Sequence, residues 1–293
     1  TNAVTMWRDW GTVPWWVDEG LSLRFWRPLT AATHWVDYQL WPESPWLMHL
    51  HSVIWYMALL WVFIRMLKQQ AIGGGLLVLA LALYGLDMAH ALAITWIANR
   101  NILIAVLLAM LSLMALHRWR SNRKHRDGFV FVVLFLGALL AAEAGIAVLA
   151  FVGAYLLVLD RGALLGRAGV AGLALMLIVL WRSIYNAMGF GAFNTGMYLD
   201  PLRDVAVYVQ TLSIHGPIML LDQITGLESF INIQSPELKA IYSKVAFVLL
   251  LAIFWLWLPL LRQRSRWDNL NRSLEPSWVV SSSVPHSAPC CWG

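Results

Sequence analysis

The chain has 293 residues, of which 60% are hydrophobic and 13% are charged, and its mean hydropathy is +0.64. These values exclude a soluble globular domain, because a surface that faces water needs more polar residues than this chain contains. The net charge of +5 does not indicate a nucleic-acid partner, since the basic residues stand in short clusters between apolar runs.

Apolar runs long enough to cross a membrane recur along the sequence, and a helix needs about 20 residues to cross the hydrocarbon layer. The runs are continuous rather than alternating, which favours helices over a β-barrel. The sequence therefore predicts an all-α polytopic membrane protein with about seven transmembrane helices, some of them short or broken. In chain order these predicted spans are 47–67, 76–97, 102–117, 129–142, 145–159, 168–185 and 241–261.

The basic residues predict the orientation of the spans, because cytoplasmic loops carry an excess of Lys and Arg. Basic residues follow the first, third, fifth and seventh predicted spans: Arg65 and Lys68, then Arg118, Arg120, Arg123, Lys124 and Arg126, then Arg161 and Arg167, then Arg262, Arg264 and Arg266. We accordingly expect three parts. Residues 1–46 form a Trp-rich interfacial loop on the non-cytoplasmic side, 47–262 form the transmembrane domain, and 263–293 form a disordered cytoplasmic tail.

The opposite, non-cytoplasmic side then receives the loop 1–46, the turn 98–101, a break near Glu143 and the long segment 186–240. Within that segment, 205–221 is apolar and contains Pro217, which is typical of an interfacial or re-entrant helix. Most residues that can support chemistry are therefore expected on this side.

Ionisable residues inside predicted spans are functional candidates, because an unpaired charge in lipid costs several kcal/mol. Asp87 and His90 are three residues apart in the second span, a spacing that places both on one helix face. They form either a functional pair or a hydrogen bond that locks two helices together. Glu143 needs a cation as its partner, and Arg100 and Arg182 lie at suitable depth in the membrane. The alternative for each arginine is that its side chain extends to the membrane interface instead.

The first loop supplies further candidates. Asp18 and Glu19 follow an aromatic stretch that can stack on a sugar ring, so either carboxylate is a candidate catalytic base; the alternative is a solvated acidic turn. Arg24 and Arg27 suit an anionic phosphate group, because arginine offers a planar fork of donors.

Two histidines open the first span. His49 and His51 are two residues apart, so on a helix they point in nearly opposite directions and make a poor metal pair. We expect one of them to face a cavity, the alternative being that each is a polar anchor at the interface.

Several short motifs resemble the GT-C superfamily of polytopic membrane glycosyltransferases. More narrowly, they are similar to bacterial membrane proteins related to the tetratricopeptide-containing protein O-mannosyltransferases. The matching motifs are FWRPLT at 25–30, HWVDY at 34–38, LWP at 40–42, HLH at 49–51, WIANRNIL at 96–103 and AEA at 142–144.

This resemblance implies an enzyme in the bacterial inner membrane that moves a sugar from a polyprenyl-phosphate donor to an acceptor on the periplasmic face. An acidic residue of the first outer loop would be the base, and membrane lipids would be its surroundings. The family's loop is preceded by a membrane helix and begins with an acidic motif, so this chain is expected to be a fragment. Divalent metal dependence varies among such enzymes, and the sequence names no ligand set, sugar or acceptor.

The alternative interpretation is a membrane transporter. Asp87, His90 and Glu143 would then form an intramembrane path for protons or substrate. A transporter should contain inverted repeats, whereas a glycosyltransferase should have one outward-facing cavity in which acid, arginine and aromatic groups meet.

Overall fold

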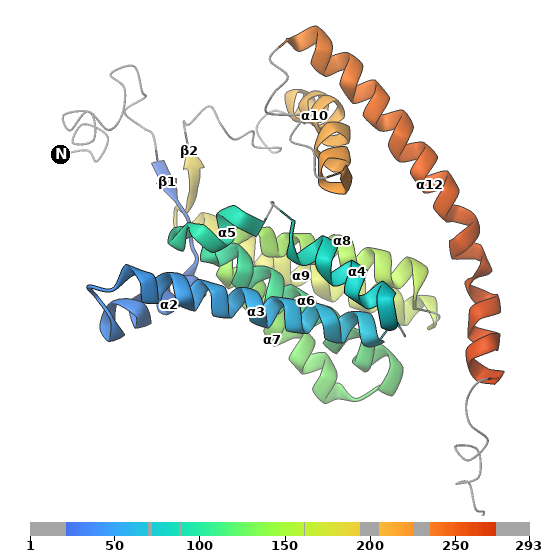
Figure 1. Cartoon of the computed structure of the whole chain (residues 1–293), viewed down its shortest axis with the longest axis horizontal. Coiled ribbons are helices and arrows are strands. Elements are labelled where there is room, and N and C mark those ends of the chain that lie inside the picture. Colours follow the sequence, from blue (N-terminus) through green and yellow to red (C-terminus); the bar gives the residue numbers. More distant parts are fainter. Residues whose placement is uncertain are drawn as a thin grey trace, which may run out of the picture. The chain divides into compact units, whose positions relative to one another are not determined.

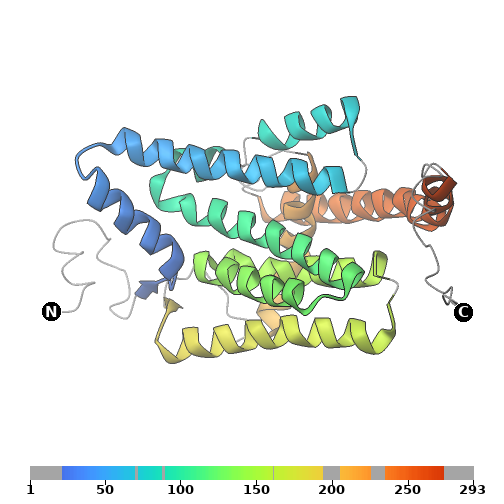
Figure 2. The ribbon, with the colours of Figure 1, turned by 90° about the horizontal axis from the view of Figure 1, so that it is seen from below.

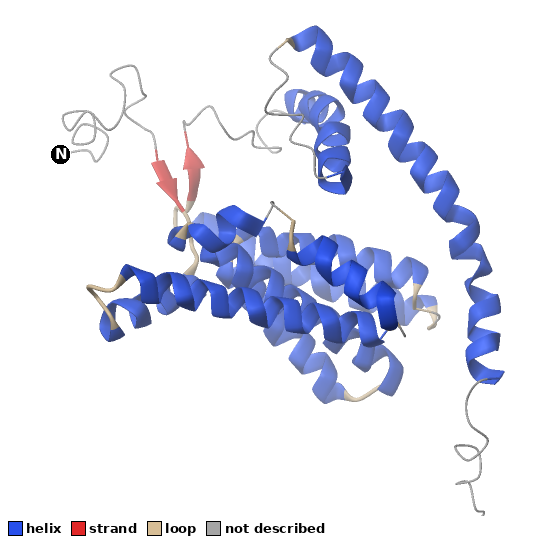
Figure 3. Cartoon of the chain, in the orientation of Figure 1, coloured by secondary structure: helices blue, strands red, loops and turns tan. Residues whose placement is uncertain are grey.

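The computed structural model describes residues 22–69, 72–87, 90–160, 162–193, 205–225 and 235–273. In this part of the chain the structure is all-α apart from one pair of short strands (Figure 3). It divides into two compact units, residues 1–208 and 209–293. The boundaries predicted at residues 46 and 262 stay predictions.

The first unit is a helical bundle. Figures 1 and 2 show α3, α6, α7 and α9 side by side with their axes roughly aligned, and the chain runs through α7 and α9 in the direction opposite to α3 and α6. Its elements are β1 (Ser22–Arg24), α2 (Pro28–Leu40), α3 (Pro45–Gln69), α4 (Gly74–Gly85), α5 (Ala91–Thr95), η2 (Ile97–Asn99), α6 (Arg100–Asn122), α7 (His125–Ala141), η3 (Glu143–Ala147), α8 (Val148–Val158), α9 (Leu164–Ala187) and β2 (Gly191–Phe193). The helices that continue the chain are α10 (Val205–Thr225) and α12 (Pro236–Ser273).

Five helical stretches in the described residues are long and apolar enough to cross a membrane: Pro45–Gln69, Ile97–Asn122, Leu164–Ala187, Val205–Asp222 and Pro236–Trp255. Two shorter apolar helices, Gly74–Gly85 and Glu143–Val158, accompany them. The chain is thus an all-α protein whose long helices have membrane-spanning dimensions. The number of seven spans, and the interfacial placement of 205–221, stay predictions.

The core of the bundle is built around α7. Phe131, Phe135 and Leu139 recur every four residues, so they lie on one helix face, and all three are fully buried. They pack in one cluster with Val152 of α8 and Ala174 of α9. Large apolar side chains on the outer faces of the helices are exposed, as suits a molecule whose solvent is lipid.

The second predicted span, 76–97, is wrong as a single helix. α4 ends at Gly85, and a short α5 begins only at Ala91, so Asp87 and His90 lie in the break between them. The carbonyl of Gly85 accepts a hydrogen bond from the Tyr56 hydroxyl of α3 at 2.5 Å. A side chain from a neighbouring helix thus satisfies a backbone group released by the break, which lipid cannot do.

The break predicted near Glu143 is present. α7 ends at Ala141, the 3-10 turn η3 starts at Glu143, and α8 follows. Gly145 lies against the backbone of α7, where a Cβ atom would be 2.6 Å from the carbonyl carbon of Ala138. Only glycine fits this close approach, which holds the Glu143 turn against the end of α7.

A small antiparallel sheet, drawn in red in Figure 3, ties the first loop to the end of α9. Its register pairs Ser22 with Phe193, Leu23 with Ala192 and Arg24 with Gly191. This sheet was not predicted from the sequence. It places the residues just before α2 beside the C-terminal end of α9.

Candidate functional site

One end of the first unit gathers charged groups from several helices. The N-terminal ends of α2, α3 and α6 meet the C-terminal ends of α7 and α9 there. Pro28 occupies the first turn of α2, where its missing N–H leaves no helical hydrogen bond unmade, and Arg27 immediately precedes it. Arg27 therefore stands where the first loop enters the bundle.

Arg27 and Glu143 form what we call the open pair. The Nε and Nη2 atoms of Arg27 both reach Oε2 of Glu143, at 2.8 and 2.7 Å. The side chains are 29% and 25% exposed, so solvent or a ligand can reach both. With its amide oriented to donate to the carbonyls of Ala98 and Asn99, the Asn101 side-chain oxygen accepts from Arg27 Nη1 at 3.1 Å.

A third helix reaches the open pair through Tyr185, a buried residue of α9. Its hydroxyl donates to Oε1 of Glu143 at 3.2 Å, and the carbonyl of Arg24 lies 3.4 Å from the same hydroxyl. The guanidinium of Arg182, which is exposed, lies 5.3 Å from the centre of the Tyr185 ring. Each oxygen of Glu143 thus has a partner from a different segment.

A second set of polar and charged groups, which we call the anchor, consists of Asp37, His51, Ser52 and Arg100, and its central ion pair is closed to solvent. The side chains of Arg100 and Asp37 are 0% and 1% exposed, and Nη1 of Arg100 lies 2.5 Å from Oδ2 of Asp37. Arg100 also donates to Ser52 Oγ at 2.9 Å and to the carbonyl of Met48 at 2.6 Å. A buried charge is tolerated when it is paired and hydrogen-bonded, and here both conditions hold.

His51 completes the anchor. Its Nε2 accepts a hydrogen bond from Trp55 Nε1 at 3.0 Å, so the proton of the neutral ring lies on Nδ1, which is 2.5 Å from Oδ1 of Asp37. Both ring nitrogens are occupied by partners within the protein. The anchor joins α2, α3 and α6 and leaves His51 no free nitrogen for a substrate.

A cleft of about 350 Å³ opens beside the two sets. Aromatic and polar side chains line it together: Phe25, Trp26, Arg27, Pro28, Thr30, Ala31, His34, Ala98, Asn101 and Phe190. The rings of Trp26 and Phe190 are stacked with their centres 6.4 Å apart. The Thr30 hydroxyl donates to the carbonyl of Ala141 at 2.9 Å, which fixes the first turn of α2 against the end of α7.

His34 is the titratable group that lies between the cleft and the anchor. Burial, followed by the positive charge of Arg100, lowers the pKa of His34 below its usual value, although Asp37 opposes the shift. The ring is therefore mainly neutral at pH 7. A neutral imidazole in a cleft can accept or donate a hydrogen bond to a bound hydroxyl.

The structure brings together Arg24, Arg27, Glu143, Tyr185 and Arg182 around the open pair. The expectation that Arg100 or Arg182 would neutralise Glu143 is wrong, since Arg27 is the ion partner of Glu143 and Arg100 binds Asp37. The reason is the strand pairing, which carries the chain before α2 to the end of α9.

The two candidate histidines of α3 separate as expected, because His51 points into the anchor whereas His49 is exposed. Asp18 and Glu19, the predicted base candidates, lie outside the described residues.

Asp87 and His90 do not lie on one face of a continuous helix, because both come after the end of α4 and before the start of α5. The ring of His90 packs between Tyr56 and Tyr84, at centre-to-centre distances of 5.6 and 4.6 Å.

The opposite end of the same bundle holds another ion pair, formed by Arg120 of α6 and Asp160 after α8, with Nε and Oδ2 2.6 Å apart. Burial alone would raise the pKa of Asp160, but hydrogen bonds from Arg120 and the Gly162 amide and the charges of Arg120 and Arg167 outweigh it, so the pKa is lowered. The side chains of Arg120 and Asp160 are 11% and 5% exposed. This ion pair is therefore largely buried, and it lies at the end of the bundle that carries the basic loops.

Sequence reasoning missed Asp37, Ser52 and Tyr185 as members of the site. Asp37 appeared only inside a motif, although its spacing from His34 on one helix face was a usable signal. In the described part of the chain, no group of three His, Cys, Asp or Glu side chains is placed to hold a metal ion.

Comparisons with protein-family models, with curated proteins and with solved structures find no match to this chain. The site is therefore interpreted from its own geometry.

Proposed function

We propose that the chain is a membrane glycosyltransferase of the GT-C kind, or a piece of one, in the bacterial inner membrane. It would transfer a sugar from a polyprenyl-phosphate donor to an acceptor hydroxyl on the periplasmic face. The observation that carries this proposal is the cleft, in which aromatic rings, a neutral histidine and an accessible arginine meet at one end of an apolar bundle.

The aromatic walls suit a sugar. Trp26 and Phe190 offer apolar ring faces, and the C–H face of a pyranose packs on such surfaces while its hydroxyls bind polar neighbours. His34 and Asn101 supply polar atoms on the same cleft. A lipid-linked donor would enter this end from the bilayer, because the outer faces of the bundle are apolar.

Arg27 suits the phosphate. Its guanidinium is fixed by Glu143 and by contact with the Phe25 ring, 4.3 Å from the ring centre, yet remains partly exposed. During transfer the acceptor oxygen attacks the anomeric carbon, the bond from that carbon to the phosphate oxygen breaks, and the polyprenyl phosphate leaves with the electron pair. Arg27 would stabilise the charge that develops on the leaving phosphate.

The proton of the acceptor hydroxyl needs a base. The resemblance assigns this role to an acidic residue of the first outer loop, so Asp18 and Glu19 are the proposed bases in this chain. Glu143 is a weaker candidate for the same role, because both of its oxygens are already engaged by Arg27 and Tyr185.

The test is sugar transfer in membrane vesicles given a radiolabelled polyprenyl-phosphate sugar, with Arg27→Gln, Arg27→Ala and Glu143→Ala in the full-length protein. We expect each variant to insert normally. The two Arg27 variants should lose transfer by about 100-fold or more, as happens when a transition-state donor is removed. Glu143→Ala should also lose transfer, because Arg27 is then no longer held in place. Because the open pair is partly exposed, its loss should cost stability only about 1 kcal/mol or less.

The matched control is Arg120→Gln, which removes an arginine from an ion pair at the other end of the bundle. It should retain transfer in the fraction that folds. Full activity of both Arg27→Ala and Glu143→Ala would overturn the site, and label that reaches no acceptor under any condition would count against the enzyme. Uptake of a solute that is lost in Asp87→Asn would instead support the transporter.

A further inference from the structure

Lys244 of α12 is a charge within an apolar stretch of helix. It belongs to the segment Pro236–Trp255, which is long and apolar enough to cross a membrane and has only 11% of its residues buried. Lys244 is exposed, and in the described part of the chain it forms no ion pair. A lysine in this setting requires a counter-charge or contact with water.

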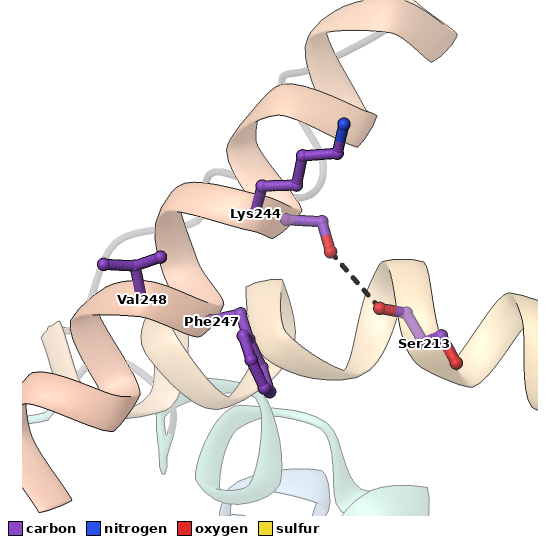
Figure 4. Close-up of a pocket in the computed structure, with 5 residues that line it drawn as sticks. Ser213, Lys244, Phe247 and Val248 are labelled. Carbon is purple, nitrogen blue, oxygen red and sulfur yellow. Dashed lines mark hydrogen bonds between the residues drawn. The ribbon is translucent and has the colours of Figure 1, made fainter.

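A groove of about 440 Å³ runs beside Lys244 between α10 and α12, lined by Ser213, Ser243, Lys244, Phe247 and Val248 (Figure 4). The Ser243 hydroxyl donates to the carbonyl of Ser213 at 3.3 Å, and the Ser213 hydroxyl donates to the carbonyl of Val209 at 2.7 Å. Both hydroxyl protons are thus used inside the protein. Among the side chains that line the groove, the ammonium group of Lys244 is the remaining donor.

The groove places a cation next to an apolar surface, and a phospholipid likewise has a charged headgroup next to its acyl chains. Lys244, Phe247 and Val248 are spaced three and four residues apart, so they lie on one face of α12. In Figure 4 the Lys244 side chain extends toward the N-terminal end of the helix, while Phe247 points into the angle between the two helices. A headgroup phosphate at Lys244 would leave its acyl chain along Phe247 and Val248.

The depth of Lys244 fits the same ligand. It follows Pro236 by eight residues, which is about 12 Å along the helix axis, and a lysine side chain bridges much of that distance to the interface. The phosphate layer of the membrane is therefore within its reach.

We propose that this groove is a binding site for an anionic phospholipid, with Lys244 holding the phosphate and with Phe247 and Val248 contacting an acyl chain. The proposal does not depend on the proposed glycosyltransferase activity. The lipid would occupy the groove between α10 and α12 and stabilise their packing, which the Ser243–Ser213 hydrogen bond and fully buried Ala246 define.

Native mass spectrometry of the whole purified protein tests this, with phosphatidylglycerol, phosphatidylcholine and a polyprenyl phosphate titrated separately. We expect one phosphatidylglycerol site that Lys244→Met weakens by about fivefold, since one cation near a membrane surface contributes about 1 kcal/mol. Lys244→Arg should retain the site. Lys68→Met, which removes an exposed cation from the end of α3, should leave it unchanged.

Equal binding by Lys244→Met and the unmodified chain would overturn the proposal, as would equal binding of phosphatidylcholine at the Lys244-dependent site. Lys244-dependent binding confined to the polyprenyl phosphate would also overturn it, because the site would then select the carrier lipid. Phe247→Ala keeps the charge and should weaken binding by a smaller factor, about twofold to threefold, through lost apolar contact.

Discussion

The open pair and the anchor lie at the same end of the same bundle, and each joins an arginine to a carboxylate, but they differ in access. The side chains of Arg27 and Glu143 are 29% and 25% exposed, whereas those of Arg100 and Asp37 are 0% and 1% exposed. A closed pair can fix helices but cannot exchange its partner for a ligand. An accessible pair beside an aromatic cleft can do so, which is why we assign binding to Arg27 and positioning to Arg100.

The largest effect is expected from breaking the anchor. Arg100→Met leaves the Asp37 carboxylate buried with only His51 beside it, and removing one partner of a buried pair costs about 3–5 kcal/mol. The free energy of unfolding in mixed detergent micelles measures this loss. Equal destabilisation by Arg27→Gln and Arg100→Met would contradict the assignment of helix positioning to the anchor alone.

A double variant separates the buried charge from the lost packing. Asp37→Asn combined with Arg100→Met removes both charges, so its cost should be smaller than the sum of the two single costs by more than about 1 kcal/mol. Additive costs would show that the two residues act independently, in contradiction to the 2.5 Å contact between them.

The next effect concerns Gly145, which sets the position of the open pair. A methyl group at Gly145 would meet backbone atoms of Ala138 and Leu139 at 2.6–2.7 Å, and rigid backbone cannot yield as a side-chain tip can. We expect Gly145→Ala to lower the free energy of unfolding by about 1–3 kcal/mol, the usual cost of overpacking. Because Glu143 would shift away from Arg27, transfer activity should fall as well.

Gly153→Ala is the matched control for this prediction. Gly153 lies in α8 with no atom within 4 Å of the added methyl, so alanine should be neutral or slightly stabilising there through its better helix propensity. A loss of stability in Gly153→Ala equal to that of Gly145→Ala would show that the close approach to α7 is not what matters.

The sequence predicted the long apolar helices 47–67, 102–117 and 168–185 because apolar length is a local property, and each lies within a long apolar helix of the structure. The predicted span 241–261 lies within α12, of which Pro236–Trp255 is long and apolar enough to cross a membrane. The break at Glu143 was predictable for the same reason, since a carboxylate beside glycine interrupts an apolar run. The break after Gly85 was not predicted, because Tyr56, which caps it, lies on another helix.

The site was predicted less completely than the helices, and Arg100 shows why. The sequence identified it as a charge at the right depth, but its partner depends on how α2 packs against α3 and α6. Asp37 lies on a short amphipathic helix in which an acidic residue resembles any solvated one. Tyr185 carries no charge, so its contact with Glu143 appears only once β1 and β2 bring the two segments together.

The smallest effect, and the one that tests how closely the two regions are coupled, is the pH dependence of stability through His34. This histidine lines the cleft beside Arg27 and faces Arg100, Asp37 and His51 of the anchor. Its pKa in the folded protein lies below the usual value of 6.5, so below that pH the unfolded chain binds more protons than the folded one. The neutral ring's contribution to stability is therefore complete above about pH 6.5 and is lost as the pH falls below it.

Thermal unfolding in detergent between about pH 7.5 and pH 5 measures this loss. In His34→Gln the decline of stability with falling pH should be shallower, whereas His49→Gln, which changes an exposed histidine of α3, should keep the original slope. If His34→Gln makes this slope shallower in the protein that keeps Arg100 but not in the Arg100→Met background, the charge of Arg100 controls the protonation of His34 in the cleft. A slope unchanged by His34→Gln would instead mean that the cleft and the anchor are electrostatically independent, and that the closed pair contributes rigidity alone.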